Sequence, residues 1–141
     1  MADGKIVEII ISELDLFVID KIREYRGKNK PYISQVELSQ RMGYADGYVG
    51  KVENFSSNAR YNIRKLNLVA KALDLNSPRD ILPMQTLNND LIFLRLKVNT
   101  KKNDTVEFFN NNVIKNYEIL EKRVLTEDQV KDHNNRRIKK S

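Results

Sequence analysis

The chain of 141 residues is long enough to bury a hydrophobic core, and a composition of 40% hydrophobic and 31% charged residues is typical of globular proteins. It contains no cysteine, which excludes disulfides and thiolate chemistry and favours a reducing, cytoplasmic environment. A formal net charge of +6 favours a polyanionic partner, of which nucleic acid is the commonest.

We expect no membrane-spanning helix and no signal peptide, and the amino-terminal segment predicts a strand. No stretch of the chain reaches the roughly 18 consecutive apolar residues of a membrane-spanning helix, so we expect none. An apolar run begins the chain, but Glu8 interrupts it and no small-residue cleavage site follows, which argues against a signal peptide. The β-branched sequence KIVEIII at residues 5–11 favours a strand within residues 1–11.

Residues 12–83 show the apolar spacing of amphipathic helices. Ser12 is a candidate N-cap of a first helix, and Gly27 followed by Pro31 predicts the end of that helix. The apolar stripe that we expect on this helix comprises Leu14, Phe17, Val18, Ile22 and Tyr25.

A second helix and a closely following third helix are predicted next. Ser34 and Glu37 form a capping-box pattern that predicts the start of the second helix. Gly43 predicts its end in the left-handed conformation. A third helix is expected over about residues 45–53, which gives the helix-turn-helix arrangement that places the later helix in the DNA major groove.

Two glycines, Gly47 and Gly50, fall inside the expected third helix, where each costs roughly 0.5–1 kcal/mol relative to alanine. Val49 and Val52 mark the side of this helix that faces the core. The glycines therefore lie on the side that would meet DNA, and their bare backbone would let the helix approach the duplex closely. The residues that share this side are Gly47, Gly50, Lys51 and Asn54.

Two more helices are predicted before residue 84. Asn62 is a candidate cap of a fourth helix, and Ser77 caps a short fifth helix that has Pro78 at its first position. The residues of the fourth helix that we expect to face inward are Ile63, Leu66, Val69, Ala70 and Leu73.

The carboxy-terminal part predicts further strands. Residues 91–98 (LIFLRLKV) alternate with the period of a strand, and the segment NVIKNYEILEK favours a return strand that forms a hairpin. We expect these strands to pair with residues 5–11, within one chain or between two. Thr126 is a candidate cap of a last helix, and the chain closes with a basic tail. An alternative to the hairpin is a helix with the stripe Val106, Phe109, Val113, Tyr117, Leu120 and Val124.

Residues 34–54 (SQVELSQRMGYADGYVGKVEN) and 66–83 (LNLVAKALDLNSPRDILP) resemble the Cro/phage-repressor, or XRE-like, family of helix-turn-helix domains. The resemblance covers about residues 16–82. It implies a mainly α fold, namely a five-helix lambda-repressor-like helix-turn-helix domain at residues 12–83. The expected organisation adds an N-terminal strand at 1–11, a C-terminal β appendage at 84–125 that could serve dimerisation, and a basic tail at 126–141.

The resemblance also assigns roles to individual residues. Arg26 and Glu53 match a structural ion pair. Lys51 is the best single candidate for a base contact, since lysine donates to guanine, with a phosphate contact or a solvated side chain as alternatives. The positions that match groove-facing residues are Asp46, Gly47, Gly50 and Lys51. The candidates for contacts to the DNA backbone are Gln35, Tyr48, Asn54, Arg60, Arg64 and Lys65, and half-buried packing is the alternative for Tyr48.

Two positions depart from the family pattern. Ala45 stands where a Ser or Thr cap is usual, so Asp46 could cap the third helix instead of facing the duplex. Phe55 stands where the family usually has glycine. These departures weaken the case for base-specific contacts more than the case for DNA binding.

The sequence therefore predicts a sequence-specific transcriptional regulator that binds double-stranded DNA as a homodimer. The alternative is an antitoxin-like or other protein-interaction module on the same fold, which binds a partner protein through residues 88–141. The single histidine, His133, and the lack of a phosphate-binding loop or metalloprotease motif argue against an enzyme. We expect no cofactor and no metal.

Overall fold

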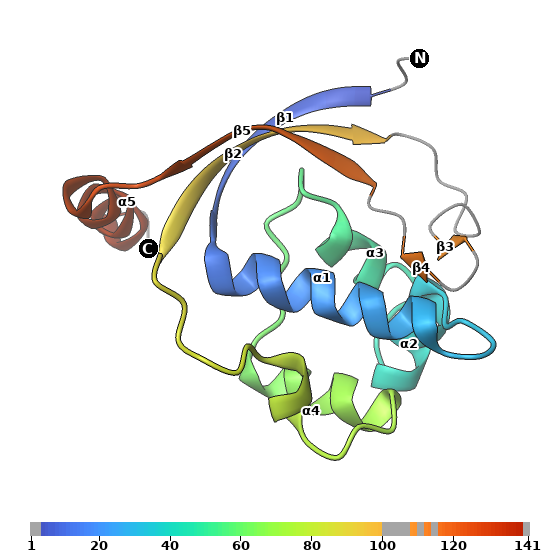
Figure 1. Ribbon diagram of the computed structural model, residues 1–141. Coiled ribbons are helices and arrows are strands. Elements are labelled where there is room, and N and C mark those ends of the chain that lie inside the picture. The colour runs from blue at the N-terminus through green and yellow to red at the C-terminus, as the bar shows by residue number, and fades with distance from the viewer. Residues whose placement is uncertain (1–3, 100–107, 110–111, 114–115, 140–141) are drawn as a thin grey trace.

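A three-stranded antiparallel sheet lies against a group of helices in the computed structural model, which describes residues 4–99, 108–109, 112–113 and 116–139 (Figure 1). The strands are β1 (Gly4–Ser12), β2 (Leu91–Asn99) and β5 (Tyr117–Val124), in the order β1-β2-β5. Strand β1 pairs with β2 without interruption, whereas the pairing of β2 with β5 shifts register between Arg95 and Leu96. The fold is therefore mixed α/β.

The expectation of a mainly α domain with a small β appendage is wrong, because the sheet forms one wall of the main core. Ile92, Leu94 and Leu96 of the central strand are all 0% exposed, and they belong to the same buried cluster as the helix residues. On β5, Tyr117 packs edge-on against Phe55, and its hydroxyl donates to the Asp20 carboxylate at 2.9 Å. An apolar strand face of this kind must be covered, and here the helices cover it.

Helix α1 (Glu13–Lys28) begins directly at the end of β1, with Ser12 as the N-cap that accepts a hydrogen bond from the Asp15 backbone. The helix does not end at Gly27, contrary to the expectation. Gly27 is a buried residue within the helix, and among the described glycines only Gly43 has a positive φ. A glycine ends a helix when it turns left-handed, and Gly27 does not.

The middle helices are α2 (Gln35–Met42), α3 (Tyr48–Glu53) and α4 (Ile63–Ala72). Helix α3 starts three residues later than expected, because residues 45–48 form a turn closed by a bond from the Tyr48 N–H to the Ala45 carbonyl. The expected fifth helix is a single 3-10 turn, η1 (Pro78–Ile81), capped by Ser77 as predicted. Ile63, expected to face inward, is 88% exposed at the first position of α4.

The carboxy-terminal part contains a short pair of strands, β3 (Phe108–Phe109) and β4 (Asn112–Val113), followed by β5 and helix α5 (Glu127–Lys139). The return strand and not the alternative helix is present at residues 117–124, while Val106 of that alternative lies outside the described residues. Thr126 and Gln129 cap the start of α5, since each accepts a hydrogen bond from the backbone N–H of the other. The segment expected to be a basic tail is helical through Lys139. Figure 1 shows α5 lying beyond one end of the sheet, apart from the other helices.

Within the part of the chain that the structure describes, no helix combines the length and the apolar character needed to span a bilayer.

Candidate nucleic-acid interface

Helices α2 and α3 are joined by a short turn that follows the expected helix-turn-helix arrangement. The Ser34 hydroxyl accepts from the Glu37 N–H at 3.0 Å and starts α2, and Gly43 ends it with φ 82°. Ser39 then links the two helices, because its hydroxyl donates to the Gln35 carbonyl and accepts from the Val49 N–H at 2.9 Å. The sequence pattern gives no role to Ser39, because a small residue at this position predicts close packing but not its partner.

A buried ionic network fixes the other end of α3. The Glu53 carboxylate, 2% exposed, accepts from the Arg26 guanidinium at 2.7 and 3.2 Å, as the resemblance implied. Arg26 also donates to the Ile33 carbonyl at 2.9 Å. Arg23, for which no sequence motif indicated a role, places its Nε 3.4 Å from the same carboxylate. Two buried arginines therefore hold one carboxylate between α1 and α3.

Gln35 is held by this network instead of extending freely toward a ligand. Its Nε2 donates to Glu53 Oε1 at 2.9 Å, so the amide that was expected to contact phosphate faces the protein. Its Oε1 lies against Gly50, where an added Cβ would approach it to 3.1 Å. Gly50 thus has a packing reason to lack a side chain, in addition to the close approach to DNA that the sequence suggested.

The opposite side of α3 is open. Gly47 is the N-cap and not an interior residue, and no side chain caps α3. The Asp46 carboxylate accepts from the Gln40 amide at 3.1 Å, so Asp46 does not cap this helix. Lys51 is exposed and forms no ion pair with any described residue, and Asn54 is also exposed at the end of the helix.

Two cations and three aromatic rings cluster at the start of α3. The rings of Tyr44 and Tyr48 stack with centroids 4.5 Å apart, and Tyr61 meets Tyr48 edge-on. The Lys65 ammonium lies 4.9 Å from the centroid of Tyr48, and Arg64 donates to the Tyr44 hydroxyl at 3.4 Å. Cations are attracted to the faces of aromatic rings. These contacts hold Arg64 and Lys65, two of the residues expected to contact the DNA backbone, beside the start of α3.

Two of the three tyrosine hydroxyls in this cluster are buried in the protein. Those of Tyr48 and Tyr61 are buried and have no hydrogen-bond partner among the described residues. Tyr48 therefore packs, as its alternative interpretation stated, and its hydroxyl is not positioned to donate to a phosphate. Burial raises the pKa of the Tyr61 hydroxyl well above its ordinary value, and the charge of Glu53 raises it further.

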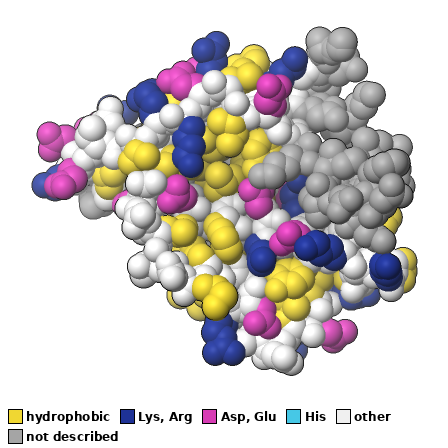
Figure 2. Space-filling model, in the orientation of Figure 1, with side chains coloured by type: hydrophobic (Ala, Val, Ile, Leu, Met, Phe, Trp, Pro, Cys, Tyr) yellow, Lys and Arg dark blue, Asp and Glu magenta, His cyan; other side chains and the backbone are white. Residues whose placement is uncertain are grey.

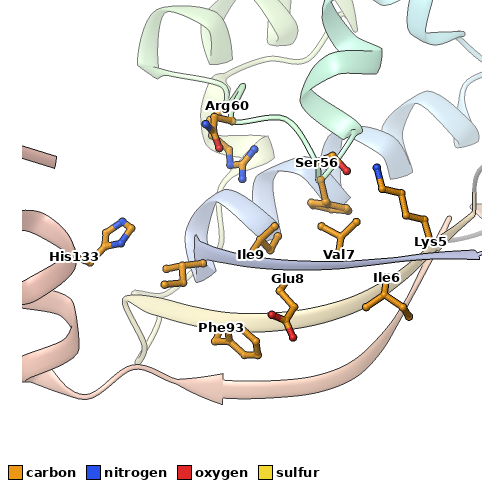
Figure 3. A pocket seen from close by; sticks show the side chains of 12 residues that line it. Lys5, Ile6, Val7, Glu8, Ile9, Ser56, Arg60, Phe93 and His133 are labelled. Carbon is orange, nitrogen blue, oxygen red and sulfur yellow. The ribbon is translucent and has the colours of Figure 1, made fainter. Parts of the chain in front are cut away.

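Arg60 lies elsewhere than the sequence predicted. It is half-buried and donates to the carbonyls of Ser57 at 3.1 Å and Ala59 at 2.7 Å. It lines a groove beside β1 instead of joining Arg64 and Lys65 (Figure 3). Burial lowers the pKa of its guanidinium, while the charge of Asp15 acts in the opposite direction.

Charge does not form a single basic patch on the face of the protein shown in Figure 2. On the face shown in Figure 2, basic and acidic side chains are interspersed, with hydrophobic side chains between them. No group of three or more metal-ligating side chains occurs among the residues that the structure describes. The candidate interface is therefore defined by the exposed side of α3 and the cations beside it.

Comparisons of the chain with protein-family models, with curated proteins and with solved structures found no match. The resemblance to the Cro/phage-repressor family stays a prediction from the residues quoted above. Function is therefore inferred from the geometry of the chain itself.

Proposed function

We propose that the protein is a sequence-specific regulator of transcription that binds double-stranded DNA, with α3 in the major groove and two copies on one operator. The observation that carries the proposal is the division of α3 into two sides. Val49, Val52 and Glu53 anchor one side in the core, and Lys51 and Asn54 leave the other side exposed. A rigidly anchored short helix with an open polar side is suited to a groove about 12 Å wide.

Each exposed residue has a definite role in this proposal. Lys51 donates to the O6 and N7 acceptors of guanine, and the bare N-cap Gly47 allows the amino-terminal end of α3 to approach the bases. Arg64 and Lys65 contact phosphates beside the groove, which positions α3 without specifying sequence. Asp46, already bonded to the Gln40 amide, sets the turn and lies near the duplex without donating to it.

We infer a homodimer because the part of α3 that would contact bases is small. Helix α3 has six residues and offers few side chains to bases, so one copy supplies few specific contacts. Two copies on half-sites one helical turn apart double those contacts and match the symmetry of most operators of this kind. A cysteine-free chain with this partner belongs in the cytoplasm.

The test is selection of bound duplexes from a random library at about 0.15 M salt, where non-specific binding is weak. We expect an inverted repeat with half-sites about 10 bp apart. Lys51→Ala should lower affinity for the selected operator by about 1–3 kcal/mol and relax preference at one base pair in each half-site. Lys65→Ala should weaken binding to all sequences alike and reduce the salt slope by about one for each protomer.

Lys71→Ala is the matched control, because Lys71 is another exposed lysine, in the last turn of α4. It should bind the operator as the wild type does. A folded protein that enriches no sequence, or that loses affinity equally with Lys51→Ala and Lys71→Ala, contradicts the proposal. The antitoxin-like, protein-binding alternative would then be the better explanation.

A further inference from the structure

A groove of about 680 Å³ runs along the outer edge of strand β1 (Figure 3). Its floor is the edge of β1, from Lys5 to Ile10. On the helical side, Ser56 and Arg60 of the loop after α3 stand over the strand, and His133 of α5 lies at one end. The groove therefore combines an exposed strand edge with walls from two separate parts of the chain.

The edge of β1 is open in the described structure. Strand β1 is the end strand of the sheet, and no backbone hydrogen bond from it to a described residue lies on its outer side. It extends over nine residues and pairs with β2 without a bulge. Unpaired strand edges of this length are templates for an added strand.

The other edge of the sheet is protected by contrast. Strand β5 has a register shift opposite Arg95, and it carries Glu118, Glu121, Lys122 and Arg123. Bulges and charged side chains are the features by which proteins prevent pairing at a strand edge. Strand β1 has only Lys5 and Glu8 as charged residues, so it is the edge that remains suited to pairing.

The shape of the groove favours a single extended strand over a second copy of the protein. Two β1 strands that paired antiparallel about a two-fold axis would place both helical layers on the same side of the joined sheet. Each copy would then bring its own loop of residues 55–60 to the same face of the joined sheet, next to the loop of the other copy (Figure 3). An isolated peptide strand brings no such loop.

The side chains along β1 define the chemistry of such a strand. On the helical side, Lys5 is exposed and forms no ion pair with a described residue. Arg60 likewise forms no ion pair with a described carboxylate, although the charge of Asp15 acts on it. On the face of the sheet away from the helices, Ile6 and Ile10 are 49% and 41% exposed. On the same face, the Glu8 carboxylate lies 3.8 Å from the Arg95 guanidinium, which balances its charge. Successive side chains of an added strand alternate between these two sides.

We propose that the edge of β1 binds an extended segment of a partner protein as a fourth strand of the sheet. The acidic side chains of that segment face Lys5 and Arg60, and the alternate, apolar side chains pack on Ile6 and Ile10. Main-chain hydrogen bonds to β1 supply affinity, and the alternation of acidic and apolar residues supplies specificity.

The test uses the full chain and a fluorescent probe peptide of about ten residues in which glutamate alternates with valine or isoleucine. A twin peptide, methylated on every backbone nitrogen, keeps the charge but has no backbone N–H to donate to a strand edge. Binding is followed by anisotropy at peptide concentrations up to about 1 mM. We expect saturable binding of the probe and at least a tenfold weaker response to the twin.

Two exposed substitutions in β1 locate the binding. Lys5→Glu and Ile6→Lys should each weaken the probe at least fivefold, while Leu120→Lys, a matched change at a residue of β5 that is 45% exposed, should leave binding unchanged. All three variants should keep the DNA affinity of the wild type. Slower hydrogen exchange of the β1 amides in the presence of the probe is a second expected result.

Three results would overturn the inference. They are no saturable binding, equal binding of the methylated twin, and weakening by Leu120→Lys to the same extent as by Ile6→Lys. Concentration-dependent dimerisation that Ile6→Lys abolishes and the probe does not compete with would assign the edge to a second copy instead.

Discussion

Glu53 and Arg26 place opposite charges in the interior, where each depends on the other. The carboxylate is 2% exposed and the guanidinium 0%, and they are joined by two hydrogen bonds. Removing the negative charge with Glu53→Gln leaves Arg26 and Arg23 buried without an acid between them. We expect a loss of about 3 kcal/mol in the free energy of unfolding, measured by urea denaturation.

The matched control is the exposed pair of Glu37 and Arg41, whose atoms lie 2.6 Å apart on the surface of α2. Glu37→Gln should cost at most about 1 kcal/mol, because solvent screens both charges. Equal losses in the two variants would show that burial of the Glu53 pair has no energetic consequence.

Arg26 and Glu53 illustrate what the sequence could predict of the site at the scale of single residues. Their ion pair agrees with the family pattern, whereas a base contact by Lys51 stays a prediction. The sequence could not predict that Gln35 bonds to Glu53 or that Arg60 turns toward β1, because both depend on neighbours far away in the chain. Arg23 likewise joins Glu53 across thirty positions of sequence.

At the scale of elements, α3 contains a glycine whose effect depends on another helix. An alanine at Gly50 would place its Cβ 3.1 Å from Gln35 Oε1, which must then shift along with its bond to Glu53. We expect Gly50→Ala to gain little stability in the wild type. In a Gln35→Ala background, the same change should gain the roughly 0.5–1 kcal/mol usual for glycine to alanine in a helix.

A double-mutant cycle measured by urea denaturation tests this coupling, which should be about 0.5 kcal/mol or more. The control cycle combines Gln35→Ala with Gly47→Ala, since an added Cβ at Gly47 meets nothing within 4 Å. The control changes should be additive. Additivity in the Gly50 cycle as well would remove packing against Gln35 as the reason for this glycine.

The starts of the helices with a side-chain cap were predictable because each cap is a local interaction, whereas α3, which has no such cap, begins three residues later than expected. Ser12, Ser34 and Asn62 each accept a hydrogen bond from a backbone N–H three residues later, so the signal lies within a few positions of sequence. Helix ends were less predictable. Gly43 ends α2 by adopting a positive φ, but Gly27, which is the same type of residue, is a buried residue within α1.

At the scale of the whole molecule, the strands were predictable but their place in the fold was not. Alternation in residues 91–98 marks a strand with one buried face, yet it does not show what buries that face. The pairing partner of Leu94 is Ile9, which lies far away in the sequence, near the amino terminus. The helices cover the buried face of this strand, so the sheet is part of the main core and not the appendage that the sequence suggested.

Tyr117 connects the sheet to α1 and makes the stability of the whole molecule depend on pH. Burial, followed by the charge of Asp20 and the hydrogen bond to it, raises the pKa of the Tyr117 hydroxyl above its ordinary value. The folded state therefore holds this proton more tightly than the unfolded state, in which tyrosine ionises near pH 10. The stabilisation is complete below that pH and is lost as the pH rises toward the folded-state pKa.

We expect the urea midpoint of the wild type to fall steadily above about pH 10. Tyr117→Phe keeps the ring against Phe55 and loses the bond to Asp20, so it should be less stable at pH 7 by about 1.5–3 kcal/mol. Its alkaline decline should be shallower than that of the wild type, since one group that ionises on unfolding is absent. Tyrosinate absorbance of the folded wild type measures the same effect directly, because Tyr117 should ionise only when the sheet separates from α1. Parallel declines in the two proteins would mean that the contact between β5 and α1 does not hold this proton.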